Sequence, residues 1–407
     1  MDRIILKRGR DSSIRRFHPW LFSGAIARIE GDPKDGGIVG ILSHEGEVLG
    51  YGHYQIGSIA VRILSFGGDN ISDSFWRDRL KKAYDARLSP GVIDMENTNC
   101  YRLVHGEGDS LPGLIIDYYN GVAVMQAHSA GMFLSGKEIG EALSNIYGKS
   151  LKAVYNKSSG TAPFKAGLKL ADGYIINDSL SDSTTESSKG AIVSENGHLF
   201  HIDWEGGQKT GFFLDQRDNR ALIKRYSEGR RVLNLFSYTG GFSIYSLAGG
   251  ALSVDSVDSS KRAVELMEMN VAVNMENFVI SRESLHYSHC MDVMAFMKEC
   301  ESNYYDMIIV DPPAFAKHRG ALSNALRAYQ RLNAAVIEKI ASGGIIFTFS
   351  CSQVVDKAIF SEAIFSAAAQ TGRTVRVIGR MTQPADHPVN IYHPEGEYLK
   401  GLILYVE

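Results

Sequence analysis

The sequence has few cysteines, no long apolar run and no excess of either charge. Only four of its 407 residues are cysteine, and they stand far apart, with no Cys-x-x-Cys pair and no histidine at zinc-binding spacing. This pattern indicates neither a disulfide framework nor a structural metal site, so we expect no metal. No apolar run approaches the roughly 20 residues that a membrane-spanning helix needs, and no apolar signal core follows the charged residues 1–10. We therefore expect a cytoplasmic protein without a membrane partner.

The near balance of charges limits what the composition says about partners. The net charge is -3 and the pI is about 6.5, so a nucleic-acid-binding surface has to be a local patch. A chain of 407 residues is too long for one ordinary core, because domains typically contain roughly 100 to 200 residues. Changes in composition predict three domains, at residues 1–72, 73–190 and 191–407.

Residues 1–72 are predicted to form a small β domain that binds RNA. Short β-type runs at 37–42, 48–54 and 59–65 are bounded by glycines and other turn residues. The start of this segment is basic and aromatic, with Arg8, Arg10, Arg16 and Trp20 as the candidate substrate contacts. Cations interleaved with aromatic rings are suited to phosphate contact and base stacking. The alternative is a solvated strand edge with a buried Trp20.

Residues 73–190 are predicted to form a small α+β domain. Residues 74–88 have helical spacing and form a linking helix, and Asn120-Gly121 between two apolar runs is typical of a β-hairpin turn. A helix at 132–147 and strands at 152–156 and 173–176 follow, and the polar residues 177–190 are predicted to be a connector.

Residues 191–407 alternate between strands and helices, which predicts an α/β, doubly wound, mostly parallel Rossmann-like sheet. Ligands bind such sheets beyond the carboxyl ends of the strands, near the point where the strand order reverses. The expected strands are 232–236, 251–257, 307–310, 345–350 and 375–379, and the expected helices include 261–274, 321–340 and 357–370.

Two strand ends point to a nucleoside cofactor. The first strand runs into Phe236-Ser237-Tyr238-Thr239-Gly240-Gly241, where glycines allow a ligand to approach the backbone closely. The spacing does not fit a dinucleotide pyrophosphate and suits S-adenosylmethionine better. Asp258, at the end of the second strand, is placed to accept both ribose hydroxyls. The alternatives are a plain tight turn for the loop and a helix cap for Asp258.

Two further strand ends point to chemistry on a base. Asp311-Pro312-Pro313 forms a rigid acidic loop that continues to Phe315 and Lys317, and such a loop can hold a flipped base by its edge and its face. Cys351 follows the next strand, where a thiolate is placed to act as a nucleophile. A terminating turn and a buried, inert cysteine are the alternatives.

These side chains suit methylation of carbon 5 of cytosine. That carbon is a poor nucleophile until a thiolate adds to carbon 6, which turns carbon 5 into an enamine carbon. Asp311 would hydrogen-bond the N3 and amino edge of the base and stabilise the charge that develops.

Several motifs resemble the bacterial RlmI-type large-subunit ribosomal RNA cytosine-5 methyltransferases along nearly the whole chain. The segments KRGR (7–10) and RFHPWLFSGA (16–25) are similar to the PUA-type RNA-binding domain of that family. YRLVHGE (101–107) and DSLPGL (109–114) match its small central domain. KTGFFLDQR (209–217), DHP (386–388), PEG (394–396) and YLKG (398–401) match its catalytic domain.

The resemblance implies a large-subunit ribosomal RNA substrate and S-adenosylmethionine as cofactor. It implies cofactor contacts from Gln216, Arg217, the 236–241 loop, Asp258, Asp292 and Asp311, with Cys351 as nucleophile. The sequence departs from the family pattern in the Cys290-Met291 pair before Asp292 and in residues 155–160, which lack the usual charged motif. Some other RNA cytosine-5 methyltransferases have a second cysteine after the acidic loop, whereas this chain has Ala314 there, as is normal for the family it resembles.

Three other readings remain open at this point. Methylation of an adenine or guanine amino group uses a similar loop with the aromatic residue directly after the prolines, whereas Ala314 intervenes here and Cys351 would be idle. A non-catalytic RNA-binding or ribosome assembly factor is the alternative from another class, and intact cofactor residues argue against it. A nicotinamide oxidoreductase lacks its dinucleotide fingerprint. The oligomeric state is open between a monomer and a homodimer.

Overall fold

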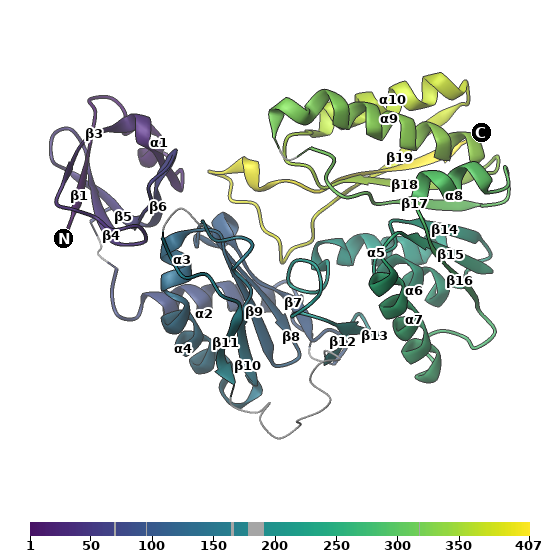
Figure 1. Ribbon diagram of the computed structural model, residues 1–407, viewed down its shortest axis with the longest axis horizontal. Coiled ribbons are helices and arrows are strands. Elements are labelled where there is room, and N and C mark those ends of the chain that lie inside the picture. The colour runs from purple at the N-terminus through teal and green to yellow at the C-terminus, as the bar shows by residue number, and fades with distance from the viewer. Residues whose placement is uncertain (69–70, 95, 164–166, 178–190, 317) are drawn as a thin grey trace. The chain divides into compact units, whose positions relative to one another are not determined.

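The computed structural model describes residues 1–68, 71–94, 96–163, 167–177, 191–316 and 318–407 (Figure 1). The chain forms two compact units, and neither is a continuous piece of sequence. Unit 1 comprises residues 1–193, 202–214 and 385–396, and unit 2 comprises residues 194–201, 215–384 and 397–407. Most of the predicted connector, 178–190, and the predicted substrate contact Lys317 lie outside the described residues.

The N-terminal sheet of unit 1 has six strands in the order β2-β6-β5-β4-β1-β3. The predicted strands appear as β4 (Ile38–Leu42), β5 (Val48–Tyr54) and β6 (Ile59–Phe66), which confirms the small β domain. Three strands were not predicted, because they are short or rich in exposed charge. These are β1 (Arg3–Leu6), β2 (Trp20–Phe22) and β3 (Ile26–Glu30), and the one-turn helix α1 (Ser12–Arg15) lies between the first two.

The second sheet of unit 1 has the order β11-β10-β9-β8-β7 and forms the α+β domain. The hairpin turn is confirmed, because Asn120 and Gly121 both have positive φ, at 44° and 101°. The prediction of a single helix over 132–147 is wrong, because the helix is interrupted at Ser135 and two helices form. The strands are β7 (Cys100–His105), β8 (Leu114–Tyr119), β9 (Val122–Ala127), β10 (Ala153–Asn156) and β11 (Gly173–Asn177), and the helices are α2 (Phe75–Leu88), α3 (Ala130–Leu134) and α4 (Gly136–Tyr147).

The break at Ser135 has a packing reason. A Cβ atom on Gly136 would meet Ile175 and Met125 at 3.3 Å, and one on Gly140 would meet Ile175 at 3.2 Å. The two glycines therefore let α4 approach β9 and β11 closely, on a line that α3 does not continue. Helical periodicity alone does not reveal such a change of axis.

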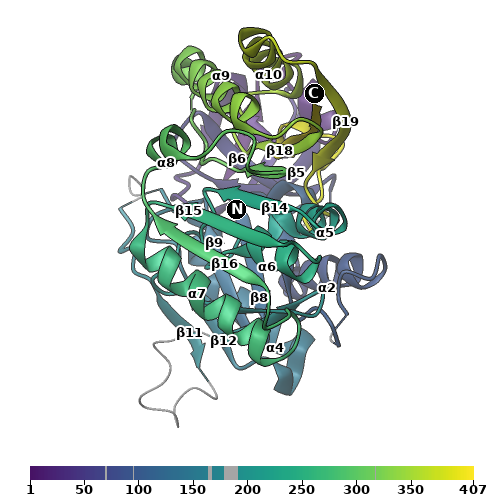
Figure 2. The same ribbon diagram turned by 90° about the vertical axis from the view of Figure 1, so that its right-hand side faces the viewer.

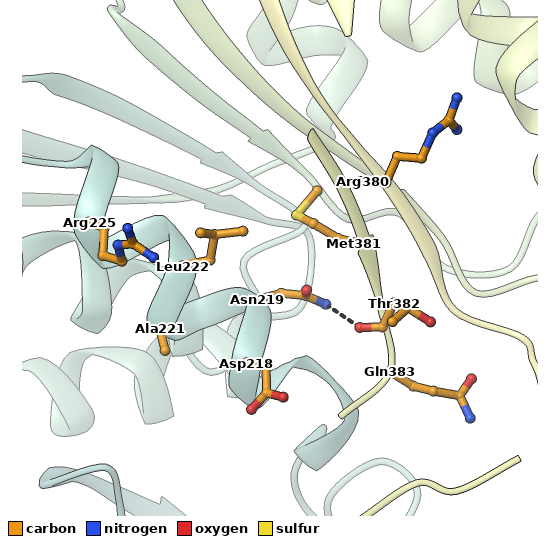
Figure 3. A pocket seen from close by; sticks show the side chains of 9 residues that line it. All are labelled: Asp218, Asn219, Ala221, Leu222, Arg225, Arg380, Met381, Thr382 and Gln383. Carbon is orange, nitrogen blue, oxygen red and sulfur yellow. Dashed lines mark hydrogen bonds between the residues drawn. The ribbon is translucent and has the colours of Figure 1, made fainter. Parts of the chain in front are cut away.

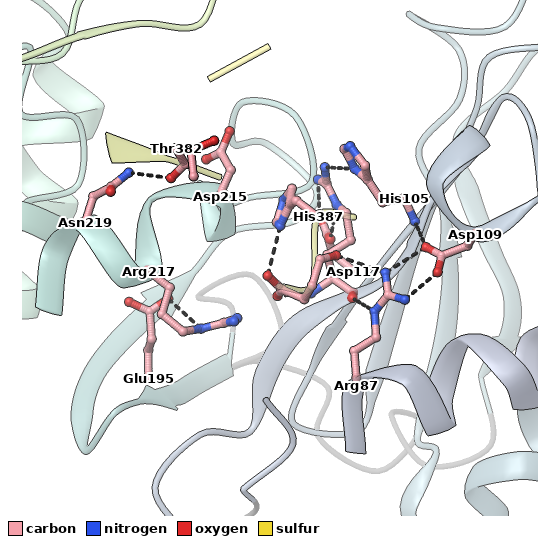
Figure 4. A network of polar contacts seen from close by, with 12 residues as sticks. Arg87, His105, Asp109, Asp117, Glu195, Asp215, Arg217, Asn219, Thr382 and His387 are labelled. Carbon is pink, nitrogen blue, oxygen red and sulfur yellow. Dashed lines mark hydrogen bonds and ion pairs between the residues drawn. The ribbon is translucent and has the colours of Figure 1, made fainter. Parts of the chain in front are cut away.

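Residues 385–396 return to unit 1 from near the end of the chain. Arg87 is fully buried, donates to both carboxylate oxygens of Asp109, and donates from Nη2 to the carbonyl oxygen of Asp386 over 2.9 Å (Figure 4). The backbone N–H of Arg102 donates to Asp386 Oδ2 over 3.0 Å. Burying an ion pair costs desolvation free energy that is offset only if the remaining donors find acceptors. The carbonyl oxygen of Asp386 is such an acceptor for Arg87.

Unit 2 is a seven-stranded sheet in the order β16-β15-β14-β17-β18-β20-β19. Five strands are parallel neighbours, and β20 runs antiparallel to both β18 and β19. Helices α5 to α7 cover one face and α8 to α10 the other, as Figures 1 and 2 show. The predicted doubly wound α/β class is therefore confirmed.

The bounds in unit 2 agree with most of the predicted segments. Two strands were missing from the prediction, β16 and β20. The strands are β14 (Arg231–Leu235), β15 (Ser253–Asp258), β16 (Leu285–Cys290), β17 (Met307–Val310), β18 (Gly344–Ser350), β19 (Val375–Thr382) and β20 (Lys400–Val406). The helices are α5 (Arg217–Tyr226), α6 (Gly241–Ala248), α7 (Lys261–Glu276), α8 (Val293–Glu299), α9 (Leu322–Lys339) and α10 (Lys357–Thr371).

A hairpin of β12 (Ala191–Glu195) and β13 (His198–Ile202) precedes these elements. Among the described residues, no helix is long and apolar enough to cross a membrane.

Candidate active site

The strand order of unit 2 reverses between the neighbours β14 and β17. The crossover after β14 leads outward to β15, whereas β17 begins the other half of the sheet. Ligands bind parallel sheets beyond the carboxyl ends of the strands at such a point. The loops after β14, β15, β17 and β18 all leave this edge, and they contain the predicted cofactor loop, Asp258, Asp311 and Cys351.

The loop after β14 is held in an uncommon backbone conformation. Phe236 and Tyr238 have positive φ, at 60° and 46°, although bulky L-residues rarely adopt the left-handed region. Such strain persists where surrounding structure enforces it, and it clusters at ligand sites. Gly240 has φ 82°, and a Cβ atom there would lie 2.6 Å from Met267 Cγ. The loop therefore turns sharply into α6, whose first N–H groups face the sheet edge.

Asp258 fixes this loop to the end of β15. Its Oδ2 accepts from the backbone N–H of Tyr238 over 2.9 Å, and its Oδ1 accepts from that of Ser260 over 2.8 Å. The side chain that caps α7 is Ser260, which accepts from the N–H of Ala263, so capping does not explain Asp258. Each carboxylate oxygen keeps a lone pair for a further donor. Asp292 is exposed and caps α8 by accepting from the N–H of Ala295.

Asp311 lies half-buried at the end of β17. Gln216 Nε2 donates to its Oδ2 over 3.0 Å, and Gln216 Oε1 accepts from Asn219 over 2.6 Å. Figure 3 shows the second bond of Asn219, to the carbonyl oxygen of Thr382. The pocket in that view is lined by none of the residues predicted to bind the cofactor. Desolvation, together with the negative charge of Asp215, raises the pKa of Asp311 to about 7.

Cys351 follows β18 and is half-buried. Ser352 Oγ donates to the carbonyl oxygen of Ala316 over 2.6 Å, which joins the loop after β18 to the loop after β17. Lys400 Nζ donates to the carbonyl oxygens of Ser352, over 2.6 Å, and Val355. The contacts therefore bring the loops of the predicted nucleophile and of the acidic Asp-Pro-Pro segment together.

The rest of the acidic loop is partly packed into the core. Pro312 is buried and Pro313 is exposed. Phe315 is half-buried, with its ring centroid 4.8 Å from that of Tyr329 on α9. Phe315 therefore has both a core contact and an accessible part.

A buried charge cluster supports the start of α6. Arg220 donates to both carboxylate oxygens of Glu195, over 2.8 and 2.7 Å. Arg217 lies 3.7 Å from the same carboxylate, as Figure 4 shows. Tyr245 donates to Glu195 from its hydroxyl over 3.0 Å. A Cβ atom on Gly241 would lie 3.1 Å from Arg220 Cδ, so this cluster lies directly against the first residue of α6.

Four residues of the site were not predicted from the sequence: Glu195, Arg220, Asp215 and Lys400. None of them belongs to a recognisable motif at a strand end. Two of them could have been found from the family motifs, because Asp215 lies in KTGFFLDQR and Lys400 lies in YLKG.

The basic segment in unit 1 contains a distinct subset of unpaired cations. Among the described residues, the exposed side chains of Arg8, Arg10 and Arg16 form no hydrogen bond or ion pair, whereas Arg15 pairs with Asp11 and Arg28 with Glu30. Trp20 is half-buried, and its Nε1 donates to Glu107 over 2.8 Å. Phe17 and Phe22 are the more exposed rings.

Comparison with known proteins identifies the family. The profile of S-adenosylmethionine-dependent methyltransferases matches residues 101–402, and that of PUA-like domains matches residues 4–66. The chain belongs to the S-adenosylmethionine-dependent methyltransferases. Relatives named ribosomal RNA large subunit methyltransferase I are 37% identical in Vibrio vulnificus, over 98% of both chains, and 38% identical in Alteromonas mediterranea, over 99% of this chain and 98% of the other. These matches confirm the family resemblance seen in the sequence.

Solved structures show the same fold. A provisionally assigned methyltransferase crystallised with SAH has a TM-score of 0.81 at 22% identity, and one from Streptococcus mutans has a TM-score of 0.79 at 22% identity. Both alignments cover 100% of each chain.

The residues of this methyltransferase fit its cofactor. Among the described residues, Ser237 Oγ and Thr239 Oγ1 are buried without a hydrogen-bond partner, although buried polar atoms are almost always paired. Both belong to the strained loop beside Asp258. Unpaired hydroxyls, an N-terminal helix turn and a carboxylate match the amino-acid carboxylate and ribose hydroxyls of S-adenosylmethionine.

Proposed function

We propose that the protein methylates carbon 5 of a cytosine in large-subunit ribosomal RNA through a transient bond to Cys351. One observation carries the choice of atom: Cys351 and Asp311 stand at neighbouring strand ends, and Ser352 joins their loops. The ribosomal substrate is supported by the names of the full-length relatives. Such a substrate places the enzyme in the cytoplasm, where ribosomes are assembled.

In the proposed mechanism the Cys351 thiolate adds to carbon 6 of the base, which breaks the C5–C6 double bond and leaves carbon 5 nucleophilic. Asp311, protonated near neutral pH by the raised pKa given above, donates to N3 and holds the negative charge that the addition creates. Bound S-adenosylmethionine supplies the methyl group as an electrophile on a sulfonium. A base then removes the carbon 5 proton, the C5–H electron pair re-forms the C5–C6 double bond, and Cys351 departs as a thiolate with the C6–S electron pair.

We assign the cofactor to the loop 236–241, with the ribose on Asp258. Gln216 and Asp292 are further proposed contacts, and Gln216 also orients Asp311. Arg217 is buried beside Glu195, which suits a role beneath the cofactor loop.

We assign RNA binding to the basic segment of unit 1. Arg8, Arg10 and Arg16 are exposed cations with no protein partner among the described residues, and an unpaired cation is available to a phosphate. Trp20 is partly accessible for a base. Pro312, Pro313 and Phe315 line the acidic loop where the target base would lie.

Amino-group methylation is the competing activity, and non-catalytic RNA binding is the competing role. The first leaves Cys351 without a function at the sheet edge. The second leaves the unpaired Ser237 and Thr239 hydroxyls unexplained.

Replacement of the nucleophile tests the proposal. We expect Cys351→Ala to abolish methyl transfer to unmodified ribosomal RNA and covalent trapping on RNA that contains 5-fluorocytidine, while leaving cofactor-product affinity unchanged. Cys300→Ala is the matched control, because its thiol lies at the end of α8, donates to the carbonyl oxygen of Met297, and belongs to none of the four loops of the candidate site. Methylation that persists in Cys351→Ala would reject carbon 5 and favour an amino group, and mass spectrometry of the RNA would identify the methylated nucleoside.

A further inference from the structure

Lys400 is a buried cation directly beside the proposed nucleophile. It begins β20 and stands opposite Ser350 in the antiparallel pairing of β18 and β20, one residue before Cys351. Only 6% of Lys400 is exposed. Lysine is rarely buried to this extent without a paired charge.

The ammonium of Lys400 holds the loop that contains Cys351. Nζ donates to the carbonyl oxygens of Ser352 and Val355, on either side of a turn in which the N–H of Val355 donates to the oxygen of Ser352 over 3.3 Å. Ser352 Oγ in turn holds Ala316 of the acidic loop. A single buried cation on β20 thus holds the loop after β18 directly and, through Ser352, the acidic loop after β17.

The charge of Lys400 has no carboxylate partner among the described residues. Nearby acids are engaged elsewhere: Asp356 caps α10, and Glu397 pairs with Lys357 on the surface. At the end of β18, directly before Cys351 in the sequence, Ser350 Oγ donates to the Tyr329 hydroxyl over 2.9 Å. Burial raises the pKa of Tyr329 to about 12, so this hydroxyl stays neutral.

Burial lowers the pKa of Lys400 to about 8, and the neighbouring Cys351 is the strongest of the groups that raise it. Coulombic coupling is mutual, so the ammonium also favours the thiolate over the thiol. Carbonyl dipoles solvate the ammonium but do not neutralise it. Ionisation of Cys351 would place an opposite charge near this ammonium and complete an ion pair.

We propose that Lys400 is a positioning residue for Cys351, whose buried ammonium both holds the loop after β18 and keeps the proposed nucleophile as a thiolate near neutral pH. This inference rests on the proposed role of Cys351. It assigns to β20 a direct part in the chemistry, in addition to its place in the sheet.

Alkylation of Cys351 separates the electrostatic role from a merely structural one. In the full chain with Cys290 and Cys300 replaced by alanine, two cysteines remain, Cys351 and the buried Cys100. Iodoacetamide labelling followed by mass spectrometry therefore reports Cys351 alone. Labelling rates from pH 6 to 10 give the ionisation of the thiol. We compare Lys400→Gln, which keeps a donor for the carbonyls, with Lys400→Arg, which keeps the charge, and Lys357→Gln serves as an exposed control.

We expect Lys400→Gln to move the midpoint of the labelling profile upward by about one pH unit or more, because an adjacent opposite charge typically lowers an acid's pKa by one to three units. Labelling and single-turnover methylation then fall roughly tenfold near pH 7 and recover in alkaline buffer. Lys400→Arg restores part of the loss, and Lys357→Gln matches the parent. Affinity for SAH, measured by calorimetry, stays unchanged and shows that the variant is folded.

An unchanged labelling profile in folded Lys400→Gln would overturn the inference, even if Cys351→Ala is inactive. If Cys351→Ala instead retains activity, the proposed function fails while the labelling experiment still reports whether Lys400 ionises the thiol. Should Lys400→Gln not fold, equal profiles for Lys400→Arg and the parent support the charge, and a shift of about one unit in Lys400→Arg rejects it.

Discussion

Replacement of Asp311 by asparagine should stabilise unit 2 while it removes a group needed for catalysis. Asparagine has nearly the same shape, and its amide oxygen can accept the bond that Gln216 now donates to Asp311 Oδ2. The substitution removes the unfavourable free energy of holding an ionised carboxylate in a desolvated site beside Asp215. Sites that serve chemistry often carry such a cost in stability.

The size of the effect follows from the shift in pKa. Burial raises the pKa of Asp311 from 3.8 to about 7, and one unit corresponds to about 1.4 kcal/mol, so the cost is about 4 kcal/mol when the carboxylate is ionised in both states. A raised pKa means that the folded state binds the extra proton between these values, so stability falls as pH rises through this window. The cost is less than half of this near pH 5 and reaches its full size only above the folded-state pKa of about 7.

Hydrogen exchange of the β17 amides measures this difference within unit 2 without assuming that the whole chain unfolds in one step. We expect the advantage of Asp311→Asn over the parent to grow by about 3 kcal/mol between pH 5 and pH 8. The exposed Asp73 forms no hydrogen bond or ion pair among the described residues, so Asp73→Asn is the control and should show no such trend. An advantage for Asp311→Asn that is flat with pH, or that shrinks as pH rises, would refute the reasoning.

Two further substitutions test the cofactor loop and the RNA surface. Gly240→Ala would place a Cβ atom 2.6 Å from Met267 on α7, so we expect the affinity for SAH, measured by calorimetry, to fall at least roughly tenfold. Gly229→Ala is the control: this glycine has φ 67° but open space around it, so the substitution should cost only about 1 kcal/mol of stability and leave SAH binding unchanged. Replacing Arg10 and Arg16 together by glutamine should weaken RNA binding and reduce the slope of log affinity against log salt by about 2, whereas Arg28→Gln removes a cation already paired on the surface and should change that slope little. Equal SAH affinity of the two glycine variants, or equal salt slopes of the arginine variants, would contradict these expectations.

Periodicity predicted the parts of the fold whose burial is uniform. β17 reads Met-Ile-Ile-Val and is buried throughout, so its continuous apolar run predicts a buried strand. β16 lies at the sheet edge and reads Leu-His-Tyr-Ser-His-Cys, with none of its residues fully buried, so it gives no apolar run. β20 begins with the buried Lys400, a residue that sequence patterns assign to the surface.

The candidate site was predictable only where a residue follows a recognisable strand. Asp258, Asp311 and Cys351 all do so. Glu195 precedes the sheet by many residues and reaches Arg220 only through folding, so its role depends on a contact that no local pattern encodes. The same holds for the bond between Ser352 and Ala316, which joins two loops that are separated by α9 and β18 in the sequence.

The return of residues 385–396 to unit 1 has a consequence for biosynthesis. A ribosome releases the N-terminal sheets long before it has made Asp386, so Arg87 must wait for its last acceptor until 299 further residues have been added. Unit 2 waits in the same way for β20, its second-to-last strand in space. Neither unit can therefore be complete before these segments have been synthesised, and nascent chains that lack residues 385–406 should stay sensitive to proteases.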